Sequence, residues 1–515
     1  MNRRTDLVII AESNFMMKTL EELALLIQGT KIIGDAKTKI ISIEHDSRKI
    51  TNGSLFVCFE GAHFDGHKFI NQAVQAGAVA ILTTRNDIEN LNIPENVAVL
   101  IVPEMLNSLA VIVPYFYDYP ARQMRVIGVT GTNGKTTTTY MIRSILINAG
   151  YHVGLIGTIQ IMIDSEIFPI HNTTPNVIDL QHLFVEMLRK HMDYVIMEVS
   201  SHALAENRVA GVEFDTAIFT NLTQDHLDFH GTMENYLKAK CKLFDAVSRS
   251  GYKQGKTAII NADDAASDEI KKHVLCNQIT YGIKNDSDLH AADVDVRAIG
   301  NKFKVRGDFG CMNLNLHVTG IFNVYNILAA VGAALAEKIE PNLICKTLEH
   351  FKSVPGRFER IFANIPFSII VDYAHTPDGV ENVIETARQI VKNRVITVFG
   401  CGGDRDRTKR PIMGRLAAEL SDIVIATSDN PRTENPAEIL KEIEVGIKEK
   451  IGSKIYECIE DRRQAIFHAV EIAKAGDIIL ILGKGHENYQ ILKDKTIHFD
   501  DREVAQEAIV NLMDN

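Results

Sequence analysis

The sequence predicts an α/β protein built on parallel sheets, and three observations support this fold class. Short β-branched runs alternate with helical patterns along most of the chain, which is typical of parallel strands covered by helices. Polar, glycine-rich segments follow directly after the strands, where open α/β sheets place their ligands. The 515 residues are too many for one core, and about 150 residues per domain suggests about three domains.

The predicted elements fall into three segments. Residues 1–120 contain helices at 20–28 and 69–76 and strands at 55–59 and 79–82. Residues 121–357 contain strands at 126–129, 194–199, 217–220 and 258–261 and a helix at 324–337. Residues 358–515 contain strands at 368–372, 395–399, 423–427 and 478–482 with helices between them. Each segment is expected to form one domain.

Composition and charge exclude several classes of protein. With 46% apolar and 23% charged residues, the chain is expected to fold rather than remain disordered. The best apolar run, Val97 to Val102, is far shorter than the about 18 residues of a membrane helix. The apolar stretch near the N-terminus is too short for a signal peptide. A net charge of -11 without a long basic tract disfavours binding to the negatively charged backbone of nucleic acid. We therefore expect a cytoplasmic protein without membrane insertion. A monomer is expected as well, although nothing in the composition determines the oligomeric state.

A candidate phosphate-binding loop lies in GVTGTNGKTTTT, Gly128 to Thr139, between a strand and a helix predicted at Tyr140 to Ala149. Glycines allow backbone amides to close around phosphate oxygens, Lys135 supplies a cation, and Thr136 offers a hydroxyl to magnesium. A glycine turn before a helix is common, but GKT in this setting favours binding of ATP or a close relative. The predicted nucleotide-binding residues of the loop are Gly131, Thr132, Asn133, Gly134, Lys135, Thr136 and Thr137.

Carboxylate and histidine side chains follow two later strands. Glu198 ends one strand, where it could hold magnesium beside Thr136 or simply face solvent. The segment NLTQDHLDFHG brings two aspartates and two histidines together, and a helix with Lys240 follows it. Such density is hard to explain by packing, although one or two of the four residues could cap the helix.

The ordered motifs of the chain resemble those of the Mur ligases, the ATP-dependent amide-forming enzymes of peptidoglycan precursor synthesis. The motifs are TGTNGKTTT, EVSSHAL, NLTQDHLDFHG, GIFNVYN, GRFER, VDYAHTPDG, FGCGGDRDRTKRPIMG, SDNPRTENP and GKGHENYQ. They extend from about Asp46 to Gln490 and are most similar to the members that add the third peptide residue. The resemblance implies three domains, with a P-loop-type central parallel sheet and a Rossmann-like C-terminal domain.

The resemblance also implies the reaction. The substrates would be ATP, UDP-N-acetylmuramoyl-L-alanyl-D-glutamate and meso-diaminopimelate, joined through an acyl phosphate. A carboxylate and a triphosphate repel each other unless cations intervene, so Mg²⁺ and a lysine are expected. Thr136 and Glu198 would hold one magnesium ion, while His226 and a carbamylated Lys240 would support a second. Without the resemblance, Lys240 would be interpreted as an exposed helix lysine. The implied catalytic residues are Lys135, Glu198, His226 and Lys240.

Family positions imply the remaining contacts. ATP would meet Asn323, Arg357, Asp372 and His375. The UDP-linked substrate would meet His45, Ser47, Ala62, His63, Phe64, Asn172, Thr173, Thr174, Ser200, Glu206 and Arg208. Glu206 departs from some relatives, which carry glutamine there. The amino acid would meet Arg405, Asp429, Asn430, Pro431, Arg432, Gly483 and Glu487.

The amino-acid pocket needs both signs of charge, because diaminopimelate carries an ammonium and a carboxylate at each end. Arg405 and Arg432 could bind carboxylates, and Glu487 could pair with an ammonium. By resemblance, DNPR is the motif of family members that use diaminopimelate. Lanthionine would satisfy the same charges, and lysine is a further alternative substrate. A folylpolyglutamate-synthetase-like ligase and a nucleotide-controlled switch protein are the remaining alternatives.

Overall fold

The structure is a computed structural model that describes residues 17–60, 65–170, 172–249, 251–297, 300–361 and 363–514. The predicted contacts at Ala62, His63 and Phe64 lie outside the described residues, as does any role of residues 1–16. Contacts divide the chain into two units. The first comprises residues 1–127, 152–215 and 249–254, and the second comprises residues 128–151, 216–248 and 255–515. The predicted α/β class is confirmed, while the three-segment division stays a prediction.

A five-stranded sheet forms the N-terminal part of the first unit. Its order is β2 (Lys31–Ile33), β7 (Ala98–Ile101), β6 (Ala78–Thr83), β5 (Ser54–Val57) and β4 (Ser42–Glu44). All neighbours are parallel except β2 and β7. Helices α1 (Leu20–Ala24), α3 (Met105–Phe116) and α5 (Val177–Arg189) contribute to the core on this sheet through Leu23, Ile112 and Ile178. Apolar residues on one face of α3 and α5 explain this packing.

The first unit also holds a short run of strands that carries predicted site residues. The run has the order β11 (Glu166–Phe168), β10 (Ile161–Ile163), β9 (Val153–Ile156) and β12 (Tyr194–Glu198). β12 is parallel to β9, and the two hairpin pairs are antiparallel. Helix α6 (Ser201–Ala205) follows β12.

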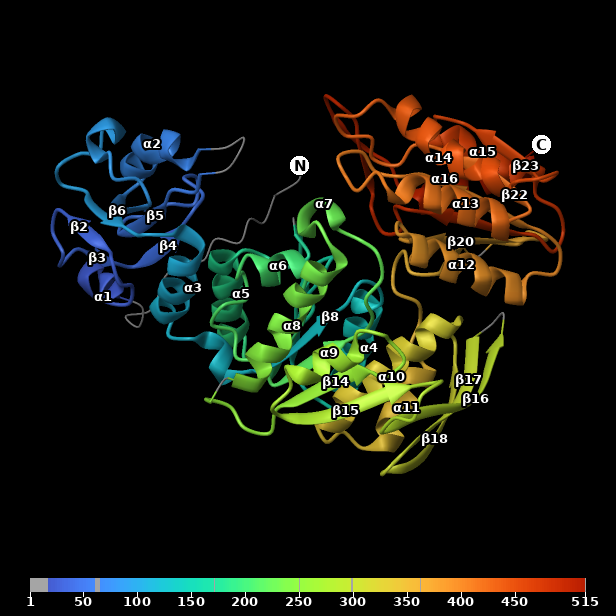
Figure 1. The fold of residues 1–515 in the computed structure, drawn as a ribbon, viewed down its shortest axis with the longest axis horizontal. Coiled ribbons are helices and arrows are strands. Elements are labelled where there is room, and N and C mark those ends of the chain that lie inside the picture. The colour runs from blue at the N-terminus through green and yellow to red at the C-terminus, as the bar shows by residue number, and fades with distance from the viewer. Residues whose placement is uncertain are drawn as a thin grey trace. The chain divides into compact units, whose positions relative to one another are not determined.

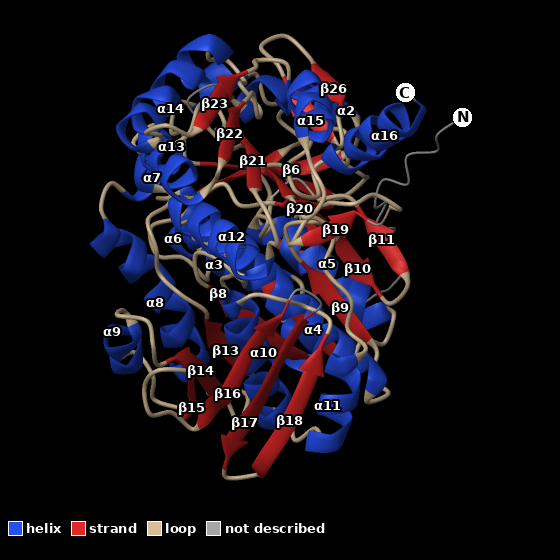
Figure 2. Ribbon diagram, turned by 90° about the vertical axis from the view of Figure 1, so that its right-hand side faces the viewer, coloured by secondary structure: helices blue, strands red, loops and turns tan. Residues whose placement is uncertain are grey.

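In the second unit, helix α4 (Lys135–Asn148) follows the end of β8 (Arg125–Thr130), and six further strands form a run. Their order is β13 (Thr216–Phe219), β14 (Thr257–Asn261), β15 (Asn277–Gly282), β16 (Leu289–Arg297), β17 (Gly300–Gly307) and β18 (Gly310–Leu316). Pairing is parallel as far as β16, and β16 to β18 form an antiparallel meander (Figure 2). The helices of this part include α8 (Met233–Arg249), α10 (Ile321–Ala336) and α11 (Pro341–Glu349).

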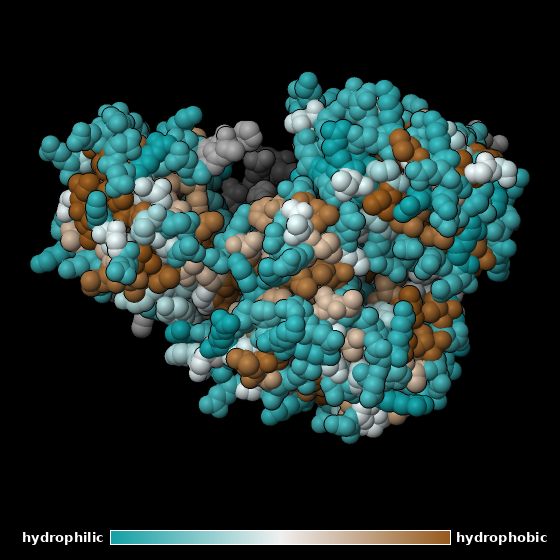
Figure 3. All heavy atoms as spheres, in the orientation of Figure 1, coloured by the Kyte–Doolittle hydropathy of each residue, from teal (hydrophilic) through white to brown (hydrophobic). Residues whose placement is uncertain are grey.

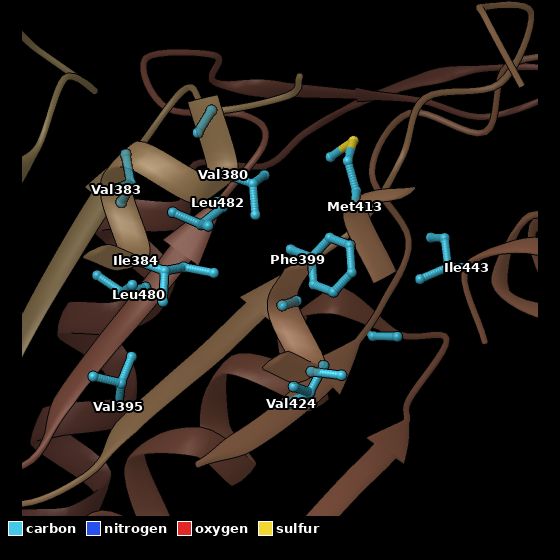
Figure 4. Packing of buried hydrophobic residues seen from close by; sticks show 14 of the residues in the cluster. Val380, Val383, Ile384, Val395, Phe399, Met413, Val424, Ile443, Leu480 and Leu482 are labelled. Atoms are coloured by element: carbon cyan, nitrogen blue, oxygen red, sulfur yellow. The ribbon is translucent and has the colours of Figure 1, made fainter. Parts of the chain in front are cut away.

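The C-terminal part of the second unit is a six-stranded sheet covered on both faces (Figure 1). Its order is β19 (Glu359–Ile361), β20 (Ser368–Asp372), β24 (Ile478–Leu482), β21 (Val395–Phe399), β22 (Ile423–Ala426) and β23 (Ile455–Cys458). One core involves α12 (Pro377–Ile390), α13 (Lys409–Leu420) and α14 (Pro436–Lys450), and Figure 4 shows part of it around Phe399. The other involves α15 (Arg462–Ile472) and α16 (Asp501–Asp514). Val424 belongs to the first core and Ile425 to the second, as expected for alternation along a strand buried on both faces.

Several details differ from the sequence prediction, among them the bounds of α4 and α1 and one antiparallel meander. α4 begins at Lys135 rather than at Tyr140, because the threonines after Lys135 are buried in the helix and packing outweighs their modest helix propensity. α1 ends at Ala24 rather than at residue 28, before a turn in which Gly29 has a φ of 87°. The meander of β16, β17 and β18 was not predicted.

None of the helices formed by the described residues is long and apolar enough to cross a bilayer. The face drawn in Figure 3 is largely hydrophilic, with apolar side chains in scattered groups.

Candidate active site

The phosphate loop depends on two glycines between β8 and α4. Gly131 has a φ of 147° and Gly134 a φ of 85°. A Cβ at Gly131 would lie 1.8 Å from Thr220 Oγ1, and a Cβ at Gly134 would lie 2.2 Å from Asn326 Oδ1. Both positions therefore require glycine for conformation and for space.

Residues after β13 hold the loop in shape. The Asn133 amide donates to Asn221 Oδ1 at 2.8 Å, and Thr220 Oγ1 donates to the Asn133 carbonyl at 2.7 Å. The Thr132 amide donates to the Asn221 carbonyl at 2.9 Å. Thr220 and Asn221 were missed as loop partners, although their position directly after a strand was a usable signal.

The cationic groups of the loop are already in place. Lys135 Nζ donates to the carbonyls of Gly131 at 2.9 Å and Thr132 at 2.7 Å. Arg357 Nη2 donates to Thr136 Oγ1 at 3.1 Å, and its guanidinium lies 4.5 Å from the centre of the Tyr373 ring. Arg357 Nε is buried and has no hydrogen-bond partner among the described residues. A lysine and an arginine at a glycine-rich loop are suited to a triphosphate.

Three side chains that were predicted to contact ATP form hydrogen bonds within the second unit. They are those of Asp372, His375 and Asn323. Asp372 accepts from the amides of Phe358 at 2.5 Å and Ala374 at 2.7 Å. Burial raises the pKa of Asp372, and the charge of Arg357 opposes that shift. His375 Nδ1 is 2.8 Å from the Tyr373 carbonyl. Asn323 Nδ2 donates to the Thr319 carbonyl at 2.8 Å.

A buried carboxylate, Asp225, is surrounded by three basic side chains. Its oxygens lie 3.6 Å from Lys409 Nζ, 3.4 Å from His226 Nε2 and 3.9 Å from His375 Nε2. Burial disfavours the charged form, but Lys409, His226 and His375 hold the pKa of this carboxyl well below its ordinary range. Burial, and then the charge of Lys409, lowers the pKa of His375 to about 4. Lys409 was missed because it is distant in sequence from NLTQDHLDFHG.

Lys240 is a buried lysine of α8, with 1% of its surface exposed. Its Nζ lies 4.2 Å from the centre of the Tyr236 ring, and it forms no ion pair with any described residue. Burial, reinforced by the charge of Lys135, holds the pKa of Lys240 well below its ordinary value, although Asp225 and Asp264 oppose the shift. The alternative of an exposed helix lysine is therefore wrong.

Glu198 lies at the end of β12 in the first unit and is completely buried. Its two carboxylate oxygens accept from the amide and the hydroxyl of Thr158, both at 2.9 Å. Thr174 Oγ1 donates to the Glu198 carbonyl at 2.8 Å and accepts from the Ser200 amide at 3.0 Å. Thr158 was missed as a partner, since 40 residues separate it from Glu198.

The other predicted substrate residues of the first unit form two groups. Arg208 Nη1 donates to the Thr174 carbonyl at 3.2 Å and pairs with Glu206, while Thr173 contacts Thr158 and Asn172 is exposed. His45 Nε2 is 3.2 Å from Asp179 Oδ2, and Ser47 Oγ donates to Gln72 Oε1 at 3.0 Å. The first group lies in the segments just before α5 and just after α6, and the second lies directly after β4.

The predicted amino-acid residues converge on loops after β21, β22 and β24. Asn430 Nδ2 donates to Glu487 Oε2 at 2.8 Å, and the Pro431 carbonyl accepts from the Glu434 amide. Arg432 has a φ of 52° and donates to the Gly403 carbonyl at 2.8 Å.

Glycines admit the charged groups of this pocket. A Cβ at Gly402 would lie 2.8 Å from Arg432 Nη1 and 3.9 Å from Arg405 Cγ, so both arginines border this glycine. A Cβ at Gly483 would lie 2.5 Å from Asp429 Oδ2. The loops after β21, β22 and β24 thus carry two arginines and two carboxylates, the charged groups that a diamino diacid would need.

Metal ligands are not preassembled from acidic and imidazole side chains alone. In the described part of the chain, no group of three or more histidine, cysteine, aspartate or glutamate residues could hold a metal ion. Thr136 and Glu198 still offer the hydroxyl and carboxylate oxygens that Mg²⁺ prefers.

Comparison with known families identifies the class. The Mur ligase middle domain matches residues 129–334, the Mur ligase, glutamate ligase domain matches residues 356–485, and the Mur ligase family, catalytic domain matches residues 39–117. The chain belongs to the Mur ligase family. It is therefore an ATP-dependent amide ligase, and the predicted resemblance is confirmed.

Individual relatives are similar over nearly their whole length. UDP-N-acetylmuramoyl-L-alanyl-D-glutamate--2,6-diaminopimelate ligase of Clostridium botulinum is 46% identical and covers 96% of this chain and 99% of its own. The ligase of the same name from Bacillus cereus is 45% identical over 94% and 97%. A solved structure of a ligase of this name is 30% identical, with a TM-score of 0.66 and coverage of 97% and 100%. MurF from Acinetobacter baumannii, at 21% identity and a TM-score of 0.67, shares the fold.

Proposed function

We propose that the protein joins meso-diaminopimelate to UDP-N-acetylmuramoyl-L-alanyl-D-glutamate with ATP, in peptidoglycan precursor synthesis. The observation that carries this proposal is the 46% identity to a ligase of that name across 96% of the chain. Arg405, Arg432 and Glu487 lie on the loops after β21, β22 and β24, and their charges would complement both ends of a diamino diacid.

The nucleotide would bind through the loop from Gly131 to Thr137, with Asn323, Asp372 and His375 completing its contacts. Lys135 would exchange two loop carbonyls for phosphate oxygens. Arg357 would contact the phosphoryl group during its transfer and stabilise the negative charge on it. Its Nε has no hydrogen-bond partner among the described residues. Mg²⁺, when bound by Thr136 and Glu198, would reduce the repulsion between carboxylate and triphosphate.

Lys240 would act as a carbamate. The neutral amine that burial favours would attack carbon dioxide, forming an N–C bond and releasing one proton. The resulting anion supplies oxygen ligands that an ammonium lacks, and with His226 it would support a second Mg²⁺.

The reaction would proceed in two displacements. An oxygen of the peptide carboxylate attacks the γ-phosphorus of ATP, and ADP leaves with the electron pair of the broken P–O bond. The amine of the diamino acid then attacks the acyl carbon, loses a proton, and expels inorganic phosphate. The site must exclude water from the acyl phosphate, since hydrolysis would waste it.

The remaining assignments complete this proposal. His45, Ser47, Asn172, Thr173, Thr174, Ser200, Glu206 and Arg208 would bind the UDP-linked dipeptide, together with Ala62, His63 and Phe64. The three segments 1–120, 121–357 and 358–515 would be domains for UDP substrate, ATP and amino acid, in a cytoplasmic monomer.

A panel of amino acids tests the reaction and its specificity together. The purified protein is incubated with ATP, Mg²⁺, the UDP-linked dipeptide and one amino acid, which is meso-diaminopimelate, lanthionine, lysine or glutamate. The mass of the product is measured by mass spectrometry. We expect meso-diaminopimelate to react best and lysine to be strongly rejected, because an arginine would remain unpaired. Equal use of lysine would refute the specificity, and ATP hydrolysis without any ligation would favour the switch protein.

A further inference from the structure

Lys484, two residues after the end of β24, is a buried lysine that the predicted pocket does not explain. Its side chain is completely buried, and its Nζ donates to Glu487 Oε2 at 3.0 Å and Asn430 Oδ1 at 3.3 Å. The third acceptor is the carbonyl of Tyr489. Three acceptors match the three hydrogens of an ammonium. Lys484 is therefore fully engaged and is not positioned to bind a ligand itself.

Lys484 fixes the orientation of the Asn430 amide. Asn430 Oδ1 accepts from Lys484 and from the Ile491 amide at 2.9 Å, while Asn430 Nδ2 donates to Glu487 Oε2. A flipped amide would direct its NH₂ group at two donors, which is unfavourable in a buried site. Lys484 and Asn430 thus both donate a hydrogen bond to the same oxygen of Glu487, Oε2.

Lys484 also sets the charge of the pocket. Burial raises the pKa of Glu487 and so does the nearby Asp429, whereas Lys484 and Asn430 lower it. The other groups that face Glu487 are the phenols of Tyr373 and Tyr489 and the more distant Arg462, which is paired with Asp501. Lys484 is thus the lysine that neighbours the Glu487 carboxylate directly, at 3.0 Å.

We propose that Lys484 is a positioning residue for amino-acid recognition, holding Asn430 and Glu487 so that Glu487 can receive an ammonium of the incoming diamino acid. The inference rests on the proposed function, since Glu487 is an amino-acid ligand only there. Lys484 acts through Glu487 and touches no reacting atom.

The first test compares Lys484→Met with Lys441→Met, a matched lysine on α14 whose side chain is 67% exposed. We expect Lys484→Met to raise KM for meso-diaminopimelate by about 30-fold or more, with KM for ATP and for the UDP-linked dipeptide changed less than about twofold. Lys441→Met should match the wild type. Unchanged KM for the diamino acid, or an equal rise in KM for ATP, would overturn the inference.

A double-variant cycle with Glu487→Gln tests whether Lys484 acts through Glu487. We expect Lys484→Met to add little to the KM of Glu487→Gln, because the carboxylate that Lys484 positions is then absent. Additive effects would overturn the inference. If Lys484→Met alone does not fold, the comparison of Glu487→Gln with the double variant decides, since the double variant leaves no unpaired Glu487 charge.

The wild-type arm separates the two proposals. Absence of ligation by the wild type refutes the proposed function and this inference with it. Ligation by the wild type with an unaltered diaminopimelate KM in the folded variants refutes the role of Lys484 alone.

Discussion

Lys240 and Lys484 are both buried, but their surroundings differ in the groups that face the nitrogen. Lys240 lies over the ring of Tyr236 and forms no ion pair with any described residue. The nearby charge of Lys135 lowers its pKa. Lys484 donates to a carboxylate, an amide oxygen and a backbone carbonyl. Burial without an acceptor favours a neutral amine, whereas three acceptors match the three hydrogens of an ammonium.

The difference shows how one residue type can serve two kinds of chemistry. A neutral amine is a nucleophile that can become a carbamate, so the Lys240 region can acquire a negative charge beside the phosphate loop. A fixed ammonium can only orient and neutralise its partners, so the Lys484 region can hold a pocket in shape. The following variants test this contrast in order of expected effect.

Lys240→Ala should have the largest effect. We expect kcat to fall by about a thousandfold or more, because a group that supports charge in the transition state is lost. A short carboxylic acid should restore part of the activity by replacing the carbamate. Lys238→Ala is the matched control, since that lysine lies on the same helix with 68% of its side chain exposed. Full activity of Lys240→Ala would remove the lysine from the reaction.

Replacing each buried lysine by methionine should separate the two regions by stability. Lys484→Met should lower the free energy of unfolding by about 3 kcal/mol, because it leaves the largely buried carboxylate of Glu487 without its lysine partner. Lys240→Met should change it by less than about 1 kcal/mol, because no ion pair is broken. Urea denaturation followed by circular dichroism measures both. Equal losses in the two variants would contradict the contrast.

Arg432→Ala should disturb only the amino-acid region. We expect KM for meso-diaminopimelate to rise about 50-fold as a carboxylate loses its guanidinium partner, with ATP binding by calorimetry unchanged. Arg463→Ala, at an exposed arginine of α15 that pairs with Glu507, serves as the control. Unaltered steady-state kinetics would exclude Arg432 from the pocket.

Acid titration should have the smallest effect and should be traced to His375, which lies beside Asp225. The pKa of His375 in the folded protein is about 4, below the ordinary value of about 6.5. The unfolded chain therefore binds more protons between these values, and stability falls as the pH is lowered from about 6.5 to 4. His375→Gln should flatten this part of the profile by on the order of 1 kcal/mol, and His350→Gln, at an exposed helix end, should not. A profile that His375→Gln leaves unchanged would contradict the assigned titration.

Regular periodicity made much of the fold predictable from sequence. β20, β21 and β24 begin and end at the predicted residues, since each is a short apolar run that is buried on both faces. The meander of β16 to β18 was missed because its mixed polar and apolar residues do not form such runs.

The candidate site was predictable as residue types but not as partnerships. GKT after a strand indicated the phosphate loop, and the structure adds that Thr220 and Asn221 brace it. Contacts such as Thr158 to Glu198 and Lys484 to Asn430 join residues 40 and 54 positions apart, which no local pattern encodes. The burial of Lys240 likewise depends on packing around α8 and not on its sequence neighbours.

Isotope transfer tests the proposed chemistry most directly. The UDP-linked dipeptide is prepared with ¹⁸O in its reacting carboxylate and incubated with the protein, ATP, Mg²⁺ and meso-diaminopimelate. If the carboxylate is phosphorylated and the amine then displaces phosphate, the released inorganic phosphate carries one ¹⁸O for each amide formed. Phosphate without ¹⁸O, in a reaction that still forms the amide, would contradict the acyl phosphate.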